Sequence, residues 1–106
     1  MSYNIVAGDL YEPLEIDVAD ASGAVNLTDA TSVQMRWKKP DGTTSLVDLV
    51  IIDAPTGRVK KVWSAGDTDQ VGVHRAQVVV TWPTAEPQTF PEDGSAIIFW
   101  VNAALA

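Results

Sequence analysis

Apolar and polar side chains alternate most clearly between Gly72 and Trp82. The positions suited to a core are His74, Ala76, Val78, Val80 and Trp82, and Arg75, Gln77 and Thr81 fall between them. A repeat of two residues is the spacing of a β-strand with one face on a core and the other toward solvent. Pro83 cannot donate to a strand ladder, so the strand is expected to end there. We expect this strand to be the central one of the fold.

A second strand is predicted by the same alternation, with Val33, Met35 and Trp37 inward and Gln34, Arg36 and Lys38 outward. Shorter strands are expected at 4–7, 12–19, 58–63, 89–90 and 96–101, and turns rich in Gly, Pro and Asp at 20–23, 40–42, 53–57 and 91–94. The segment 64–67 has the spacing of a capping box and is expected to form a single turn.

The run from Leu46 to Ile52 is apolar except at Asp48, so its faces cannot be assigned. Such a run indicates either a strand covered on both sides or a strand that carries a bulge. Taken together, the segments predict about seven or eight short, mostly antiparallel strands. Many short strands separated by turn signals are typical of a β-sandwich, here expected as one domain over residues 1–106.

Composition narrows the class of protein. The 106 residues are 46% hydrophobic and 20% charged, as in an ordinary globular domain. Cysteine is absent, which excludes disulfides and a thiolate zinc site. A net charge of −7 argues against nucleic acid as a partner. The N-terminal residues lack the pattern of a secretory signal peptide and no apolar run is long enough to span a membrane, so we expect neither export nor membrane insertion.

Charge is distributed unevenly along the chain. All seven Lys and Arg residues lie between positions 36 and 75, whereas residues 1–35 hold six acids and no base. The residues that we consider candidates for an electrostatic contact with a neighbouring copy are Arg36, Lys38, Lys39, Arg58, Lys60 and Lys61 on the basic side and Glu12, Glu15 and Asp17 on the acidic side. The alternative is a mixed, solvated surface, because sheet pairing can interleave distant segments.

The last predicted strand is apolar on both faces, which adds Ile98 and Trp100 to the candidate interface. A second subunit would cover them, or residues 3–6 of the same chain would fold over them. The other three tryptophans, Trp37, Trp63 and Trp82, are expected in the core. If Trp100 instead lies exposed on a concave surface, stacking of a sugar becomes the alternative function.

The residues that could carry chemistry do not form a catalytic set. His74 is the only histidine and has no nucleophile or metal-ligand pattern beside it, so we expect it to be structural and to hydrogen-bond a backbone carbonyl. The loop acids Asp67, Asp69, Glu92 and Asp93 could bind calcium, but turn capping is the simpler reading. We therefore predict no enzymatic activity, no cofactor and no metal.

Several segments together resemble a known family. They are Gly8-Asp9, Leu14–Asp20, Asn26–Thr31, Pro40–Gly42, Thr56–Val59, Ala65–Thr68, Gly72–Ala76 and Phe90–Gly94. In this order they are similar to the immunoglobulin-like domains of tailed bacteriophages, typified by the N-terminal domain of the baseplate upper protein. His74 departs from the pattern, which usually has tyrosine there.

The resemblance implies an immunoglobulin-like β-sandwich and a non-enzymatic structural role in a virion, in the baseplate, the tail or the head-neck assembly. It implies other phage structural proteins as partners, repeated copies of the chain, and synthesis in the host cytoplasm before assembly into the virion. Longer members carry receptor-binding and coiled-coil regions after this domain, so the present chain is expected to be a stand-alone module. A carbohydrate- or receptor-binding module is the alternative function.

Overall fold

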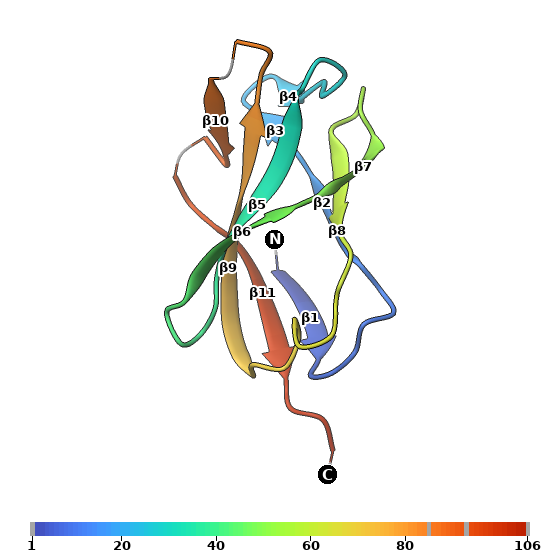
Figure 1. The fold of residues 1–106 in the computed structure, drawn as a ribbon, viewed down its shortest axis with the longest axis vertical. Helices are drawn as coiled ribbons and strands as arrows, with labels where there is room; N and C mark the ends of the chain where they lie inside the picture. Colours follow the sequence, from blue (N-terminus) through green and yellow to red (C-terminus); the bar gives the residue numbers. More distant parts are fainter. Residues whose placement is uncertain (1, 85, 93, 106) are drawn as a thin grey trace.

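The computed structural model describes residues 2–84, 86–92 and 94–105, and over these ranges the chain forms eleven strands and no helix. The predicted central strand is β9 (Gly72–Thr81), which is the longest strand and pairs with three others. On one side it pairs with β5 (Ser32–Lys38), and on the other with β11 (Ile97–Asn102) and then β10 (Pro87–Phe90). The prediction of a central strand is confirmed (Figure 1).

The large sheet is completed by an edge strand at each end, giving the order β1-β11-β9-β5-β6 with β10 beside β9. β6 (Thr44–Asp48) pairs with β5, and β1 (Ser2–Val6) pairs with β11. All the pairings in this sheet are antiparallel except that of β1, which runs parallel to β11. The sheet is therefore mixed, in agreement with the expectation of mostly antiparallel strands.

A second, smaller sheet has the order β2-β8-β7. It contains β2 (Leu14–Asp17), β8 (Arg58–Lys61) and β7 (Val50–Asp53). A hairpin of β3 (Ala19–Asp20) and β4 (Gly23–Ala24) forms a third, two-stranded sheet, and Gly23 takes the positive φ expected of its turn. Two of the strands beyond the expected seven or eight come from this hairpin.

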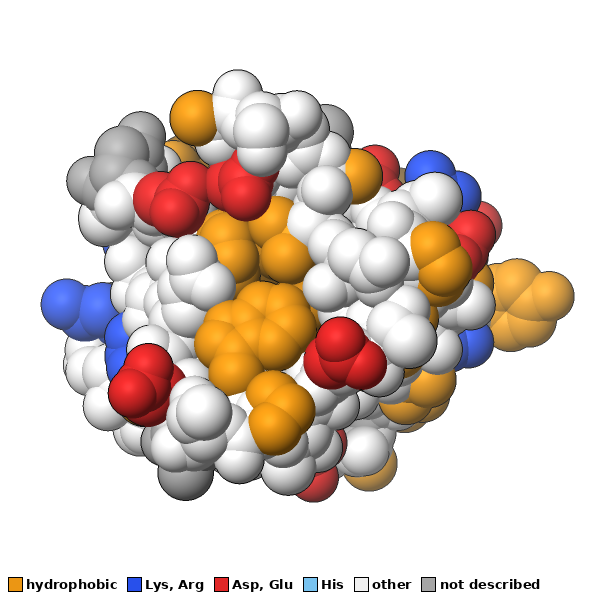
Figure 2. Space-filling view, turned by 90° about the horizontal axis from the view of Figure 1, so that it is seen from above, with side chains coloured by type: hydrophobic (Ala, Val, Ile, Leu, Met, Phe, Trp, Pro, Cys, Tyr) orange, Lys and Arg blue, Asp and Glu red, His pale blue; other side chains and the backbone are white. Residues whose placement is uncertain are grey.

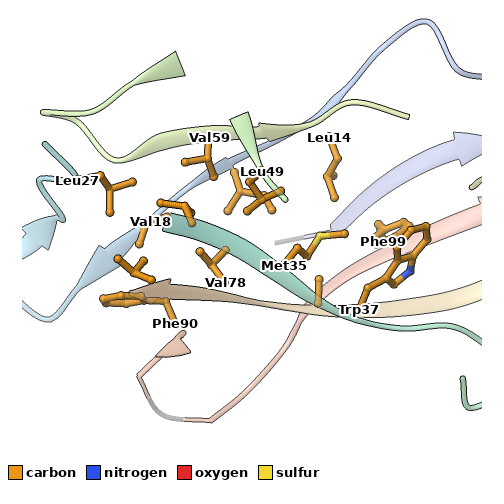
Figure 3. Packing of buried hydrophobic residues seen from close by; sticks show 14 of the residues in the cluster. Leu14, Val18, Leu27, Met35, Trp37, Leu49, Val59, Val78, Phe90 and Phe99 are labelled. Atoms are coloured by element: carbon orange, nitrogen blue, oxygen red, sulfur yellow. The ribbon is translucent and has the colours of Figure 1, made fainter. Parts of the chain in front are cut away.

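Buried side chains from both larger sheets form one hydrophobic cluster (Figure 3). The inward positions predicted on the two main strands are buried, namely Val33, Met35, Trp37, His74, Ala76, Val78 and Val80, while Trp82 is half-buried. A shift of the pattern by one residue would bury Arg36 and Gln77 instead. Arg36 is exposed and Gln77 only half-buried, so the predicted phase of both strands is confirmed.

The apolar run from Leu46 to Ile52 is not one strand covered on both sides, which corrects that expectation. The chain leaves the large sheet at Asp48, buries Leu49 in the core and enters the small sheet at Val50. The pairing of β7 with β8 shifts register between Ile51 and Asp53, so the alternative of an irregular strand is confirmed for this part. Leu49 is buried because it lies where the chain passes between the two sheets.

Candidate interaction surface

The large sheet has one face on the core and one face toward solvent. Residues directly opposite each other in paired strands have side chains on the same face. Trp100 lies opposite Val73, Arg75 opposite both Ile98 and Lys38, and Arg36 opposite both Gln77 and Leu46. We call this surface the outer face and define it by Arg36, Lys38, Leu46, Val73, Arg75, Gln77, Ile98 and Trp100.

The apolar part of the outer face lies over β11 and β9. The side chain of Trp100 is 45% exposed, and its neighbours Ile98 and Val73 are half-buried. β1 does not fold over them. It lies beside β11 in the plane of the sheet, with Asn4 opposite Trp100. The alternative that residues 3–6 cover this surface within one chain is therefore wrong, since these residues extend the sheet.

The basic part of the outer face lies over β5 and β9. Arg36 Nη1 donates a hydrogen bond of 3.3 Å to Gln77 Oε1. Gln77 Nε2 in turn donates to the backbone carbonyls of Gly94, at 3.2 Å, and Ser95, at 3.0 Å. Lys38 and Arg75 have no carboxylate within ion-pair distance among the described residues. Arg36, Lys38 and Arg75 therefore share this surface with no ion pair to an acid in the part of the chain that the structure describes.

Lys39 follows the outer face at the turn after β5. Its Nζ lies 4.8 Å from the ring centroid of Trp37, which is a cation–π distance. A depression of about 110 Å³ is lined by Lys38, Lys39, Pro40, Gly42, Val73 and Arg75. The basic residues at 36–39 are thus brought together with Arg75, which lies far from them in the sequence.

The second basic segment, 58–61, has a different setting. β8 pairs in register with β2, so that Arg58 lies opposite Asp17 and Lys60 opposite Glu15. Arg58 Nε is 3.1 Å from Asp17 Oδ1. The acids and bases that we expected to meet between two copies therefore meet inside one chain, as the alternative of interleaved segments predicted.

Lys61 does not reach the surface, which corrects its place among the interface candidates. It is 7% exposed, and its Nζ donates to the carbonyl of Val62 at 2.6 Å and to Asp67 Oδ2 at 3.1 Å. The sequence held a signal for this placement, because Lys61 lies at the same two-residue phase as the inward residues Val59 and Trp63.

Glu12 lies in the connection between β1 and β2, where it lines a groove of about 430 Å³. Tyr3, Ile5, Tyr11 and Leu14 are among the other lining residues. Burial, followed by the charges of Asp17 and Glu15, raises the pKa of Tyr3 above its usual value. Glu12 thus lies in a connection outside the strands, whereas Glu15 and Asp17 lie on β2 opposite Lys60 and Arg58.

His74 is part of the core, as expected. Its Nε2 is 2.8 Å from the carbonyl oxygen of Gln70, and its ring stacks on Phe99 with the centroids 4.7 Å apart. Burial lowers the pKa of His74 below its usual value. The predicted hydrogen bond to a backbone carbonyl is confirmed.

Asp20, Asp41 and Asp67 accept backbone N–H groups of their own turns. Asp67 Oδ2 accepts the backbone N–H of Ser64 at 2.7 Å, so the segment 64–67 forms the single turn that was expected. Hydrogen bonds from Ser22 and Thr43 lower the pKa values of Asp20 and Asp41, respectively. Asp93 lies outside the described residues. Among the described residues, no three His, Asp or Glu side chains are grouped closely enough to hold a metal ion.

Acidic residues gather at one end of the molecule. Backbone hydrogen bonds join its loops, from Val25 to Val18, from Leu27 to Ala54 and from Thr31 to Thr81. We call residues 18–31, 53–57, 81–84 and 86–87 the loop end. It holds Asp20, Asp29, Asp53 and Glu86, and Arg58 at its border lines a hollow together with Asp53. Figure 2 looks onto this end and shows apolar side chains at its centre with acidic side chains around them.

Two features of the surface were missed by sequence reasoning. Arg75 was not among the interface candidates, although its polar position on the central strand placed it on the solvent side. The edge strand β7 also leaves Val50, Ile51 and Ile52 exposed, which no periodicity in that apolar run could have predicted.

No protein-family model matches this chain, and neither does any curated protein sequence. In the described part of the chain, no helix has the length and the hydropathy needed to cross a membrane.

Proposed function

We propose that this chain is a non-enzymatic structural component of a tailed-phage virion that acts through protein–protein contacts. The observation that carries the proposal is the outer face, where Trp100 is exposed beside Ile98 and Val73 and near cations that form no ion pair with the described residues. Aromatic residues and arginine are enriched where proteins bind each other. The resemblance to phage domains supplies the virion as the setting, with other phage structural proteins and further copies of the chain as partners.

The strand order supports an immunoglobulin-like sandwich as the architecture. In such domains the central strands of one sheet follow the order G-F-C-C′, and strands B, E and D form part of the facing sheet. The orders β11-β9-β5-β6 and β2-β8-β7 correspond to these arrangements. Trp37 then lies on the strand that carries the core tryptophan of immunoglobulin domains.

His74 adds to this correspondence. It lies near the start of β9 and bonds a backbone carbonyl four residues upstream, as the tyrosine of an immunoglobulin tyrosine corner bonds the backbone. The imidazole would thus replace the tyrosine that the family usually has at this position.

The proposal is tested by locating the protein in particles. An antibody raised against the purified chain is applied to intact particles of the tailed phage whose genome encodes the chain. The particles are then viewed by negative-stain microscopy. Labelling at one repeated position on the particle is the expected result. Particles that remain unlabelled, although the antibody detects the chain in the lysate, would refute the virion role.

A glycan-binding module is the second candidate, because the exposed ring of Trp100 offers a surface on which a sugar could stack. The test is a titration with glycans that is followed by tryptophan fluorescence. A change in fluorescence that is lost in Trp100→Glu but kept in the core variant Trp63→Phe would favour glycan binding over assembly.

A further inference from the structure

Two basic residues lie directly opposite each other in the centre of the outer face. The register of β5 and β9 pairs Lys38 with Arg75. Like charges in such positions destabilise a sheet. Arg36 lies two residues along β5 on the same face, and none of the three has an ion-pair partner in the described ranges. The isolated domain thus carries a repulsion that a bound anionic group would relieve.

Between the three cations lies a depression whose exposed lining is almost entirely apolar, so it receives apolar atoms while the cations around it face the anionic groups. It has a volume of about 210 Å³ and is lined by Arg36, Lys38, Thr44, Arg75, Ala76, Gln77 and Ala96. The hydrogen bond from Arg36 to Gln77 uses one guanidinium N–H and holds the side chain in place. Guanidinium has five N–H groups, so most remain free to donate to a carboxylate.

We propose that this basic depression binds the acidic loop end of a second copy of the chain, an inference that rests on the proposed function. Charge complementarity favours this occupant. The loop end contains four acids, with Arg58 at its border beside Asp53, and it complements a face whose three cations have no ion-pair partner among the described residues. Apolar side chains accompany the charges on both surfaces, with Trp82 at the loop end and Ile98 on the outer face.

A symmetric contact between two outer faces does not meet this requirement. It would bring two surfaces that both carry Arg36, Lys38 and Arg75 against each other, and like charges brought together at an interface disfavour the contact. The partner surface must therefore be a different part of the molecule. A contact between two different surfaces is heterologous, so it repeats from copy to copy and forms either a ring or a filament.

The first test changes Lys38 to Glu and measures stability and self-association together. Lys38→Glu turns the repulsive pair with Arg75 into an attractive one, so the Tm should rise by roughly 1–5 °C. Self-association in sedimentation velocity at low ionic strength should weaken by roughly tenfold or more. The matched control is Lys60→Glu on the small sheet, which places two acids opposite each other at Glu15. It should lower the Tm and leave self-association unchanged.

The second test mixes two variants whose self-association is weakened. Lys38→Glu keeps an intact loop end, and Asp29→Asn with Glu86→Gln keeps an intact outer face. Mixed in equal amounts they should form a complex of twice the 11.4 kDa chain mass and nothing larger, because the remaining surfaces are both disabled. A wild-type chain that stays monomeric at every concentration, or variants that fail to pair, would overturn the inference.

Heparin and polyglutamate serve as probes for another anionic partner. Retention on either polymer by a chain that stays monomeric would also overturn the inference, and would assign the depression to a polyanion.

Labelling of particles by antibody does not depend on self-association. If the chain is monomeric and the antibody still labels particles, only the contact between the outer face and the loop end is refuted, and the virion role stands.

Discussion

Trp37 Nε1 donates a hydrogen bond to His74 Nδ1 across 3.0 Å in the core. Both side chains are fully buried, and their rings contact Phe99 as well. Because His74 Nδ1 accepts this bond, its Nε2 must carry the proton that is donated to the carbonyl of Gln70. The imidazole is thus neutral and satisfied at both nitrogens, and the pair joins β5 to β9 beneath the outer face.

The first prediction compares the two buried tryptophans of this aromatic cluster. Trp37→Phe leaves His74 Nδ1 without its donor, whereas Trp63 Nε1 has no hydrogen-bond partner among the described residues. Both changes remove the same volume, so packing losses are similar. We expect Trp37→Phe to lower the free energy of unfolding by roughly 1–2 kcal/mol more than Trp63→Phe. Equal losses in urea denaturation would contradict the role given to the hydrogen bond.

The second prediction concerns acid stability. The folded-state pKa of His74 is lowered, chiefly by burial, so the unfolded chain takes up a proton more readily. The hydrogen bond to Gln70 and the charge of Asp41 oppose this shift, while Lys39 adds to it. The contribution of His74 to stability is complete above the unfolded pKa of about 6.5 and is lost as pH falls toward the folded value.

This loss is measured as the free energy of unfolding between pH 7 and pH 5. His74→Asn serves as the control, because it cannot titrate and should show a flatter dependence on pH over this range. The carboxyls of Asp20 and Asp41, whose folded-state pKa values are lowered, contribute stability that is lost only at lower pH. The same slope in wild type and His74→Asn would show that His74 does not cause the loss.

The third prediction tests a glycine at the turn between β7 and β8. Gly57 has a φ of 73°, and a Cβ there would lie 2.6 Å from the carbonyl oxygen of Val25 and 2.7 Å from that of Val18. Gly42 has a φ of 88° but nothing within 4 Å of a Cβ. Gly42→Ala should cost roughly 1–2 kcal/mol for the left-handed backbone alone. Gly57→Ala should cost clearly more, as measured by thermal unfolding, and similar costs would contradict the close approach.

The sequence was sufficient to predict the strands in which polar and apolar residues alternate. Val33 to Trp37 and His74 to Val80 have this pattern, and their buried faces were predicted correctly. The passage of the chain between sheets at Leu49 could not be predicted, because its neighbours are apolar on both sides. An unbroken apolar run carries no period that distinguishes a covered strand from a change of sheet.

The basic surface could be predicted only in part. The outward positions of Arg36 and Lys38 followed from the period of β5, and that of Arg75 from the period of β9. Their proximity depends on the register of two strands whose paired residues are 37 to 49 positions apart in the sequence, from Lys38 with Arg75 to Ser32 with Thr81. Local patterns do not determine such a register, because a shift of two residues would keep every side chain on its face.

The central claim, that the outer face binds other virion components, is tested most directly by incorporation of Trp100→Glu into particles. Val62→Glu is the control, because Val62 has a similar exposure (50%, against 45% for Trp100) but lies away from the outer face. Val62 follows β8 of the small sheet. Each tagged chain is supplied during phage growth, and its amount in purified particles is measured by immunoblot, with circular dichroism of the isolated chains to verify folding. We predict that both variants fold, that Val62→Glu enters particles at the wild-type level, and that Trp100→Glu is excluded from them. Entry of folded Trp100→Glu at the wild-type level would contradict the claim.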